Sequence, residues 1–196
     1  MNRDKDTLRR IARERRASAH GNVDPAPALE RLKGLLSGTD GPVSFYWPIR
    51  TEIDPRPVML ALQASRTVCL PVTHGRDAAL TFRRWHEGMD MEKDGFGVSI
   101  PALDEPVTPR VLVVPMLAFD SRCHRLGYGA GHYDRTLAAL RPHARVVAIG
   151  LAYAAQHSDA DLPVEATDQP LDAIVTEFGI VRPENGSSLA WQADDV

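Results

Sequence analysis

The architecture of this chain is clearest in residues 111–135, which read VLVVPMLAFDSRCHRLGYGAGHYDR. The first four residues form a continuous apolar run, which is typical of a strand buried on both faces of a parallel sheet. A polar loop follows, and residues 133–140 then place Leu137 and Leu140 on one side of a predicted helix. Residues 145–150 are mostly apolar and predict the next buried strand. Strand, loop, helix and strand in this order form a βαβ unit, which indicates an α/β fold.

The rest of the chain contains further helices and strands that fit such a fold. A basic helix is predicted over residues 3–19, and the next helix has Asp24 as its cap, Pro25 at its first position and Gly38 after its end. Residues 95–110 are rich in glycine and proline and predict a loop. The remaining predicted elements are a helix over 58–64 and strands over 43–47, 67–70, 81–85 and 172–176. Together they predict a three-layer α/β/α sandwich with a mostly parallel, Rossmann-like sheet, formed by a single domain of residues 1–182 and followed by a polar tail at 183–196.

The composition is that of an ordinary folded protein. Of 196 residues, 43% are hydrophobic and 25% are charged, which excludes disordered, collagen-like and coiled-coil chains. The net charge of −3 and the isoelectric point near 6.2 argue against a protein that binds polyanions. We expect small-molecule partners, no nucleic acid, and a chain that is a monomer or a weak homodimer.

Cysteine usage and the N-terminal sequence bear on the compartment. Cys69 and Cys123 form no CxxC pair and have no metal-site spacing, which is typical of a reduced intracellular protein. Met1 is followed by polar and charged residues rather than by the apolar core of a secretory signal. No run approaches the roughly 18 apolar residues that a membrane span requires. We therefore expect a cytoplasmic protein with no membrane partner.

Three glycines alternate in the loop between the buried strand and the helix. Gly127, Gly129 and Gly131 lie at the carboxyl edge of the predicted sheet, where open α/β folds bind ligands. Without Cβ atoms, the backbone can adopt positive φ and bring its N–H groups close to phosphate oxygens. Arg125 would add a guanidinium group, and Asp134 an oxygen ligand for Mg²⁺. The alternative is a tight strand-to-helix loop in which Asp134 only complements the helix dipole.

The spacing of these glycines is neither that of a Walker loop nor that of the dinucleotide motif GxGxxG. Residues 115–135 instead resemble the signature of the 5-formyltetrahydrofolate cyclo-ligase family, which is close to PGLAFDxxGxRLGYGGGYYDR. The chain departs from this pattern at Met116, Cys123, Ala130 and His132. The resemblance continues through the segments 5–9, 46–54, 82–85, 95–101 and 168–177.

The resemblance implies an enzyme that depends on ATP and Mg²⁺. Members of this family convert 5-formyltetrahydrofolate to 5,10-methenyltetrahydrofolate with release of ADP and phosphate, and we expect the reaction to pass through a phosphorylated N5-formyl group. By this resemblance Arg125 and Tyr128 act in catalysis, Asp134 and Asp168 hold Mg²⁺, and the folate is bound by Trp47, Glu52 and Tyr128. The residues expected to bind ATP are Lys5, Arg9, Arg125, Leu126, Gly127, Tyr128, Gly129, Ala130, Gly131, His132 and Tyr133.

The basic and acidic residues of this set also have purely structural interpretations. Lys5 and Arg9 lie four residues apart and therefore side by side on a helix, where a solvated basic face or a nucleic-acid-binding arm is the alternative. Asp168 lies in an acidic region that is ordinarily surface charge. Two other functional classes stay open: a small-molecule kinase or sugar-phosphate enzyme with the same phosphate loop, and a non-catalytic regulator that binds folate or a nucleotide.

The residues expected to bind folate suit the chemistry of a pterin. A pterin is flat and rich in N–H donors, so the carboxylate of Glu52 and the ring of Trp47 complement it by hydrogen bonding and stacking. A carboxylate in a loop is ordinarily only solvated, which is the alternative for Glu52. Phe82 and Trp85 either extend the aromatic wall or belong to the core.

Overall fold

The computed structural model describes the backbone of residues 2–183 and the side chains of residues 5–183. Its centre is a seven-stranded sheet in which the five inner strands are parallel and both edge strands are antiparallel to their neighbours. In spatial order the strands are β11 (Ile180–Val181), β10 (Ala173–Val175), β9 (Val147–Leu151), β6 (Val111–Val114), β1 (Val43–Ser44), β2 (Val68–Val72) and β3 (Thr81–Trp85). The predicted α/β class with a mostly parallel sheet is confirmed.

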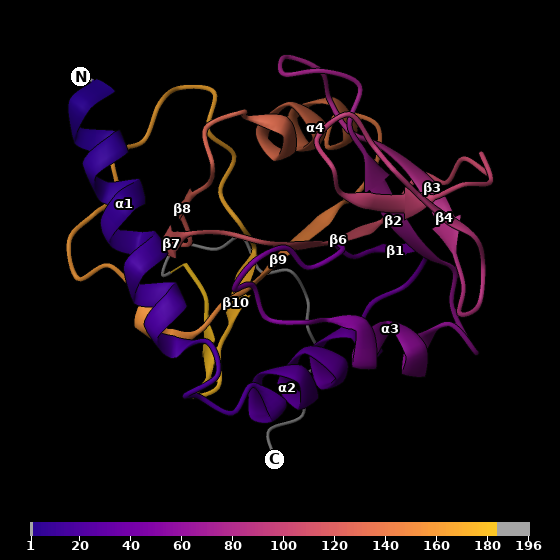
Figure 1. Ribbon diagram of the computed structural model, residues 1–196, viewed down its shortest axis with the longest axis horizontal. Coiled ribbons are helices and arrows are strands. Elements are labelled where there is room, and N and C mark those ends of the chain that lie inside the picture. The colour runs from indigo at the N-terminus through magenta and orange to yellow at the C-terminus, as the bar shows by residue number, and fades with distance from the viewer. Residues whose placement is uncertain (1, 184–196) are drawn as a thin grey trace.

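The helices of the described chain are α1 (Asn2–Ala19), α2 (Ala26–Ser37), α3 (Arg56–Leu62), α4 (His132–Leu140) and the short 3-10 helix η1 (Ala154–Gln156). In Figure 1, α2 and α3 lie on one side of the sheet and α4 lies on the other. Side chains alternate along β6, so Val111 and Val113 join the core beneath α2 and α3. Leu112 and Val114 point the opposite way and pack with Leu137 of α4.

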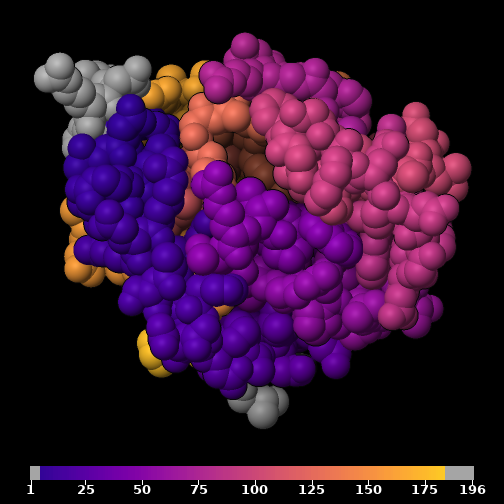
Figure 2. All heavy atoms as spheres, viewed as in Figure 1, coloured from indigo at the N-terminus to yellow at the C-terminus, as the bar shows by residue number. Residues whose placement is uncertain are grey.

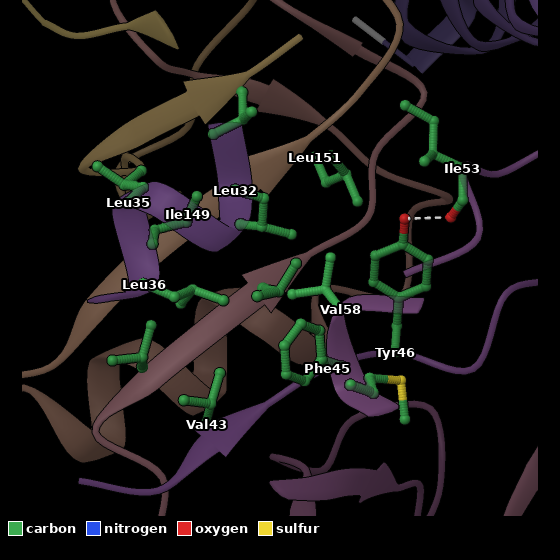
Figure 3. Packing of buried hydrophobic residues seen from close by; sticks show 14 of the residues in the cluster. Leu32, Leu35, Leu36, Val43, Phe45, Tyr46, Ile53, Val58, Ile149 and Leu151 are labelled. Carbon is green, nitrogen blue, oxygen red and sulfur yellow. Dashed lines mark hydrogen bonds between the residues drawn. The ribbon is translucent and has the colours of Figure 1, made fainter. Parts of the chain in front are cut away.

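Close packing beneath α2 and α3 also fixes a turn that matters for the site (Figure 3). Leu32 and Val58 pack in one cluster with Tyr46. The buried hydroxyl of Tyr46 donates a hydrogen bond of 2.6 Å to the carbonyl of Ile53. This bond closes the segment that follows β1, and Glu52 lies directly before the residue that accepts it.

The order of the strands creates a switch point between β1 and β6. From β1 the chain passes through α3 to β2 on one side, whereas from β6 it passes through α4 to β9 on the other. The two parallel neighbours β1 and β6 therefore send their following loops away from each other, which opens a crevice at their carboxyl ends. The turn that carries Glu52 follows β1, and the glycine loop of residues 127–131 follows β6 by way of the hairpin of residues 118–126.

Two hairpins lie where the sequence predicts loops. One is formed by β4 (Met91–Lys93) and β5 (Ser99–Pro101), so the predicted loop over 95–110 is wrong for β5. The other is formed by β7 (Ala118–Phe119) and β8 (Arg125–Leu126), inside the polar loop after β6. Strands of two or three residues are too short to show a hydrophobic period, which is why the pattern missed them.

Strand ends also differ from the prediction. The strand predicted over 43–47 ends at Ser44, and β2 runs through Pro71 instead of ending before it. Proline is tolerated there because β1 pairs only with Val68 and Cys69 of β2. Beyond Cys69 the β1 side of β2 has no ladder bond for Pro71 to lose.

The N-terminal helix packs outside the main sheet. Ala12 of α1 lies in a small cluster with Leu117, Ala118 and Leu126, so α1 rests on the β7–β8 hairpin, beside which Figure 1 shows it. Within the described residues, no helix is both long and apolar enough to cross a bilayer. From residue 184 onward the predicted tail over 183–196 lies outside the described residues.

Gly150 in β9 provides a test of packing in the centre of the sheet. A Cβ on Gly150 would collide with the Met116 methyl group and lie 2.9 Å from Leu171 Cδ1, whereas a Cβ on Gly34 in α2 would meet nothing within 4 Å. We expect Gly150→Ala to lower the free energy of unfolding by about 1–3 kcal/mol through overpacking. The control Gly34→Ala should raise it by about 0.5–1 kcal/mol, since alanine favours a helix. Urea unfolding measures both, and equal stability of the two variants would contradict this packing.

Candidate active site

A buried ion pair lies at the switch point between β1 and β6. Arg16 of α1 is 2% exposed and Glu52 is 6% exposed, and their side chains approach to 3.4 Å between Nη1 and Oε1. Arg16 also donates from Nη2 to the hydroxyl of Tyr128 at 2.6 Å. The Tyr128 hydroxyl in turn lies 3.3 Å from Oε1 of Glu52, to which it donates. The expected folate-binding residues Glu52 and Tyr128 are thus brought together, with Arg16 between them.

Backbone groups and burial set the charge state of this cluster. The amide of Ile49 donates to Oε2 of Glu52 at 3.0 Å. Burial raises the pKa of Glu52, while the Ile49 amide and the charge of Arg16 partly oppose this rise. Burial, followed by the charge of Glu52, raises the pKa of Tyr128, so its phenol stays protonated and can donate at neutral pH.

Arg50 shapes the rim of the same cluster. Its backbone has a φ of 56°, a left-handed conformation that costs a non-glycine residue about 1–2 kcal/mol. Its guanidinium carbon lies 6.0 Å from the centre of the Tyr128 ring, within range of a cation–π contact. The strained turn therefore places a second cation, besides Arg16, near the ring of Tyr128.

The glycine loop adopts the backbone that its sequence predicts. Gly129 and Gly131 have φ angles of 102° and 66°, and Gly131 directly precedes α4. Arg9 of α1 donates from Nε to the carbonyl of Gly127 at 3.2 Å, and a Cβ on Gly129 would lie 3.1 Å from its Nη2. Among the described residues, no acceptor bonds the amides of residues 127–131. Free amides, a cation and a helix N-terminus together fit an anionic ligand.

A second group of predicted residues surrounds a small cavity beside this loop. Arg125, Asp134, Asp168 and Gln169 line it. Arg125 donates to Asp134 at 2.5 Å and to the carbonyl of Gln169 at 2.5 Å, and the amide of Gln169 donates to the same oxygen of Asp134 at 3.0 Å. Burial lowers the pKa of Arg125, although the charge of Asp134 opposes this effect. Arg125 is therefore tied to Asp134 in this structure rather than standing free for a phosphate.

Lys5 joins the same group from α1. Its ammonium lies 2.7 Å from Glu165 and 3.8 Å from Asp168. Lys5 and Arg9 thus contact residues 165–168 and the glycine loop rather than forming a wholly solvated basic face, and Asp168 is half-buried. Arg13, one turn beyond Arg9, is exposed.

The donors present fit a magnesium ion, although within the described chain no three His, Cys, Asp or Glu side chains gather to hold a metal. Mg²⁺ is commonly bound by one or two carboxylates together with waters and substrate phosphates. Asp134 and Asp168 line one cavity. Oδ1 of Asp134 is engaged by Arg125 and Gln169, and Oδ2 of Asp168 accepts from the amide of Glu165, so each carboxylate has a second oxygen for a cation.

Several residues that are predicted to bind ATP make contacts with other parts of the protein. His132 turns to the neighbouring loop, where its Nδ1 lies 3.0 Å from the carbonyl of Ala78. Burial and then the charge of Glu52 raise the pKa of Tyr133, whose ring packs at the edge of the α4 core. Leu126 is buried beneath α1, and the carbonyl of Ala130 accepts from Arg135.

Among the aromatic residues, Trp47 is half-buried. Its ring lies under the guanidinium group of Arg56 at 5.1 Å. Trp85 is buried in the core beneath α2 and α3, and Phe82 is buried in the core beneath α4. The alternative that both residues belong to the core is therefore confirmed. Phe96 is half exposed on the β4–β5 hairpin and meets the His132 ring edge-on at 5.8 Å, a contact that the sequence does not reveal.

A space-filling view shows a hollow in the surface at this end of the sheet (Figure 2). Its border includes purple atoms from the segment after β1, magenta and pink atoms from the segments around β3 to β5, and orange atoms from the glycine loop and α4. The segment after β1, the segments around β3 to β5 and the start of α4 therefore border one open depression.

Comparison with known proteins identifies the family of this chain. The profile of the 5-formyltetrahydrofolate cyclo-ligase family matches residues 3–177. This chain belongs to that family. The 5-formyltetrahydrofolate cyclo-ligase of Escherichia coli K12 is 37% identical over 68% of this chain and 76% of its own length. The enzyme of the same name from Mycolicibacterium smegmatis is 31% identical over 94% of this chain and 96% of its own.

A solved structure supports the same membership of the cyclo-ligase family. The solution structure of Aquifex aeolicus 5,10-methenyltetrahydrofolate synthetase superimposes with a TM-score of 0.77 at 29% identity. The match covers 94% of this chain and 95% of that protein. The match therefore extends over nearly the whole length of both proteins.

The sequence analysis of this cyclo-ligase family member did not predict Arg16 as a site residue. The sequence does contain a signal for it: Ala12, Arg16 and Ala19 follow one another at helical spacing, so a charge interrupts the apolar stripe of α1. Ala12 and Ala19 are buried on either side of it. A cation in such a position needs a buried partner, which is Glu52.

The ion pair yields a prediction about stability. Arg16→Met leaves Glu52 buried without its cation and should lower the free energy of unfolding by about 3–5 kcal/mol. The control Arg10→Met removes an exposed pair with Glu14 and should cost less than about 1 kcal/mol. Denaturant unfolding of both variants at neutral pH tests the difference.

The pH dependence of that loss is a further check on the same variant. An acid whose pKa is raised in the folded state contributes stability that is present below its unfolded pKa and is lost as pH rises through the folded pKa. Arg16→Met removes a charge that lowers the pKa of Glu52. The loss of stability should therefore be larger at neutral pH than at about pH 4, where the Glu52 carboxyl is neutral. A loss that does not depend on pH would contradict a role of the Glu52 charge.

Proposed function

We propose that this protein cyclises 5-formyltetrahydrofolate to 5,10-methenyltetrahydrofolate and converts one ATP to ADP and phosphate. The main support for the proposal is the position of the glycine loop, which has Arg9 on one side and the pair of Glu52 and Arg16 on the other. Arg9 contacts the carbonyl of Gly127, and the neighbouring Tyr128 contacts Glu52 and Arg16. A nucleotide on one side of this loop and a folate on the other would meet at Tyr128.

The chemistry explains why a nucleotide is needed. Ring closure requires N10 of the folate to attack the N5-formyl carbon, after which the formyl oxygen must leave. That oxygen leaves poorly as hydroxide. In the proposed route it attacks the γ-phosphorus of ATP, and ADP departs with the electron pair of the broken P–O bond. N10 then attacks the carbon and loses its proton, and the oxygen departs as part of inorganic phosphate. The protein contributes positioning and charge stabilisation.

The nucleotide side is assigned to the basic residues of α1 and the glycine loop. Lys5, Arg9 and the free amides of residues 127–131 would bind phosphate oxygens, because they are cations and N–H donors at or beside the glycine loop. Asp134 and Asp168 would hold Mg²⁺ through their remaining oxygens. When bound, Mg²⁺ supplies positive charge against the triphosphate. Arg125 holds Asp134 in place and lies within the same cavity.

The folate side is assigned to the residues after β1. Glu52 would accept hydrogen bonds from the N–H groups of the pterin, and Trp47 would form part of the wall. Because the pKa of Tyr128 is raised, its hydroxyl stays a donor and would face the formyl oxygen. Such a donor stabilises charge that develops on oxygen in the transition state.

An isotope experiment tests the proposed reaction. Purified protein with 5-formyltetrahydrofolate, Mg²⁺ and ATP should show a rise in methenyl-folate absorbance, and omission of ATP or chelation of Mg²⁺ should abolish it. With ¹⁸O in the formyl group, the label should appear in the released phosphate. Unlabelled phosphate would exclude the phosphorylated route. ATP consumption without methenyl product, or binding without turnover, would favour a kinase or a regulator instead.

The glycine loop gives a prediction about nucleotide affinity. Gly129→Ala forces a side chain into a left-handed residue and against Arg9, so it should weaken binding of a non-hydrolysable ATP analogue about tenfold. The control Gly88→Ala has the same type of backbone strain at a φ of 79°, with nothing within 4 Å of the added Cβ. Both variants should lose about 1–2 kcal/mol of stability. Calorimetry measures the affinity for the ATP analogue. Equal affinity of the two variants would contradict binding of the nucleotide at this loop.

A further inference from the structure

The arrangement around Arg16 goes beyond holding a helix in place. We propose that Arg16 is a positioning residue for the cyclisation: it supports turnover by orienting the Tyr128 hydroxyl toward the folate, and it supports folate binding by holding the Glu52 carboxylate. The inference rests on the proposed function. It assigns to α1 a role on the folate side of the loop, in addition to the nucleotide contacts of Lys5 and Arg9.

The guanidinium group of Arg16 contacts four partners that come from three different segments. Nε donates to the hydroxyl of Thr51 at 3.1 Å. Nη1 donates to Glu52 at 3.4 Å and to the carbonyl of Met116 at 3.3 Å. Nη2 donates to Tyr128 at 2.6 Å, and the guanidinium carbon lies 5.6 Å from the centre of that ring. One planar group thus joins the turn after β1, the chain after β6 and the glycine loop.

The direction of these hydrogen bonds determines where the proton of Tyr128 points. Arginine is only a donor, so the hydroxyl of Tyr128 must accept from Arg16 and its single proton must be directed elsewhere. In this structure its acceptor is Glu52, at a long distance of 3.3 Å. When pterin N–H groups engage Glu52, that proton becomes available to an oxygen of the substrate. Without Arg16 the hydroxyl could rotate and donate in any direction.

The same contact fixes the carboxylate. Arg16 lies on the Oε1 side of Glu52, and the amide of Ile49 holds Oε2. The carboxylate plane is therefore set before any ligand binds, which reduces the cost of ordering it on binding. A lysine in place of Arg16 would keep the charge, but its ammonium group cannot reproduce the planar fork that serves four partners.

The test is a double-mutant cycle on turnover. Arg16→Lys should lower kcat for the cyclisation roughly 100-fold, because it misplaces Tyr128, and should leave the KM for ATP within about twofold. In a Tyr128→Phe background the same substitution should cost less than about threefold, since the group through which it acts is already gone. The control Arg15→Lys changes the neighbouring exposed arginine, which donates to the carbonyl of His157, and should cost less than about twofold in either background.

Each outcome decides one point. Equal losses for Arg16→Lys in both backgrounds, or a loss confined to the KM for ATP, would overturn the positioning role and leave Arg16 as a structural anchor. A wild-type protein without turnover would instead refute the proposed function itself. If Arg16→Lys does not fold, Thr51→Val enters the same cycle, because it removes one acceptor of Arg16 and keeps the ion pair. It should lower kcat roughly tenfold in the wild type, and the loss should disappear in Tyr128→Phe.

Discussion

The buried pair of Arg16 and Glu52 is the constraint on which the candidate site depends. Two charges removed from water are tolerated only when their other hydrogen-bonding groups are satisfied. Thr51, the carbonyl of Met116 and the hydroxyl of Tyr128 satisfy the guanidinium group. These groups lie in separate segments. The hydrogen bonds that one ion pair requires therefore bring α1, the turn after β1 and the glycine loop together.

The sheet decides where that place can be. Among the described strands, β1 and β6 are the one pair of parallel neighbours that send their following chain in opposite directions. Their carboxyl ends therefore have room for polar side chains that a continuous layer of helices would cover. The left-handed residue Arg50 lies in the turn after β1, and Gly129, also left-handed, lies in the glycine loop. Both segments contribute a residue to the cluster around Arg16.

Charged residues at the site serve more than one role. Considered as single residues, Arg125 suggests a phosphate ligand and Asp134 a metal ligand. In the structure each is the partner of the other, and Gln169 completes the contact. A substitution at Asp134 would therefore disturb a buried arginine as well as the proposed cation site, so a loss of activity has two possible causes. The double-mutant approach separates such effects because it measures coupling rather than loss.

The sequence alone determined the elements that have a clear hydrophobic period and the loop that has a clear motif. β6, α4 and β9 follow from apolar runs and helical spacing, and glycine allows the positive φ angles of Gly129 and Gly131, although Gly127 does not adopt one. Tertiary structure decided the short hairpins β4–β5 and β7–β8, since two or three residues have no period. It also decided the partners of Arg16, which are 36 and 112 residues away at Glu52 and Tyr128. Such contacts depend on strand order and on the free-energy cost of burying a charge, and neither can be predicted from a local stretch of the sequence.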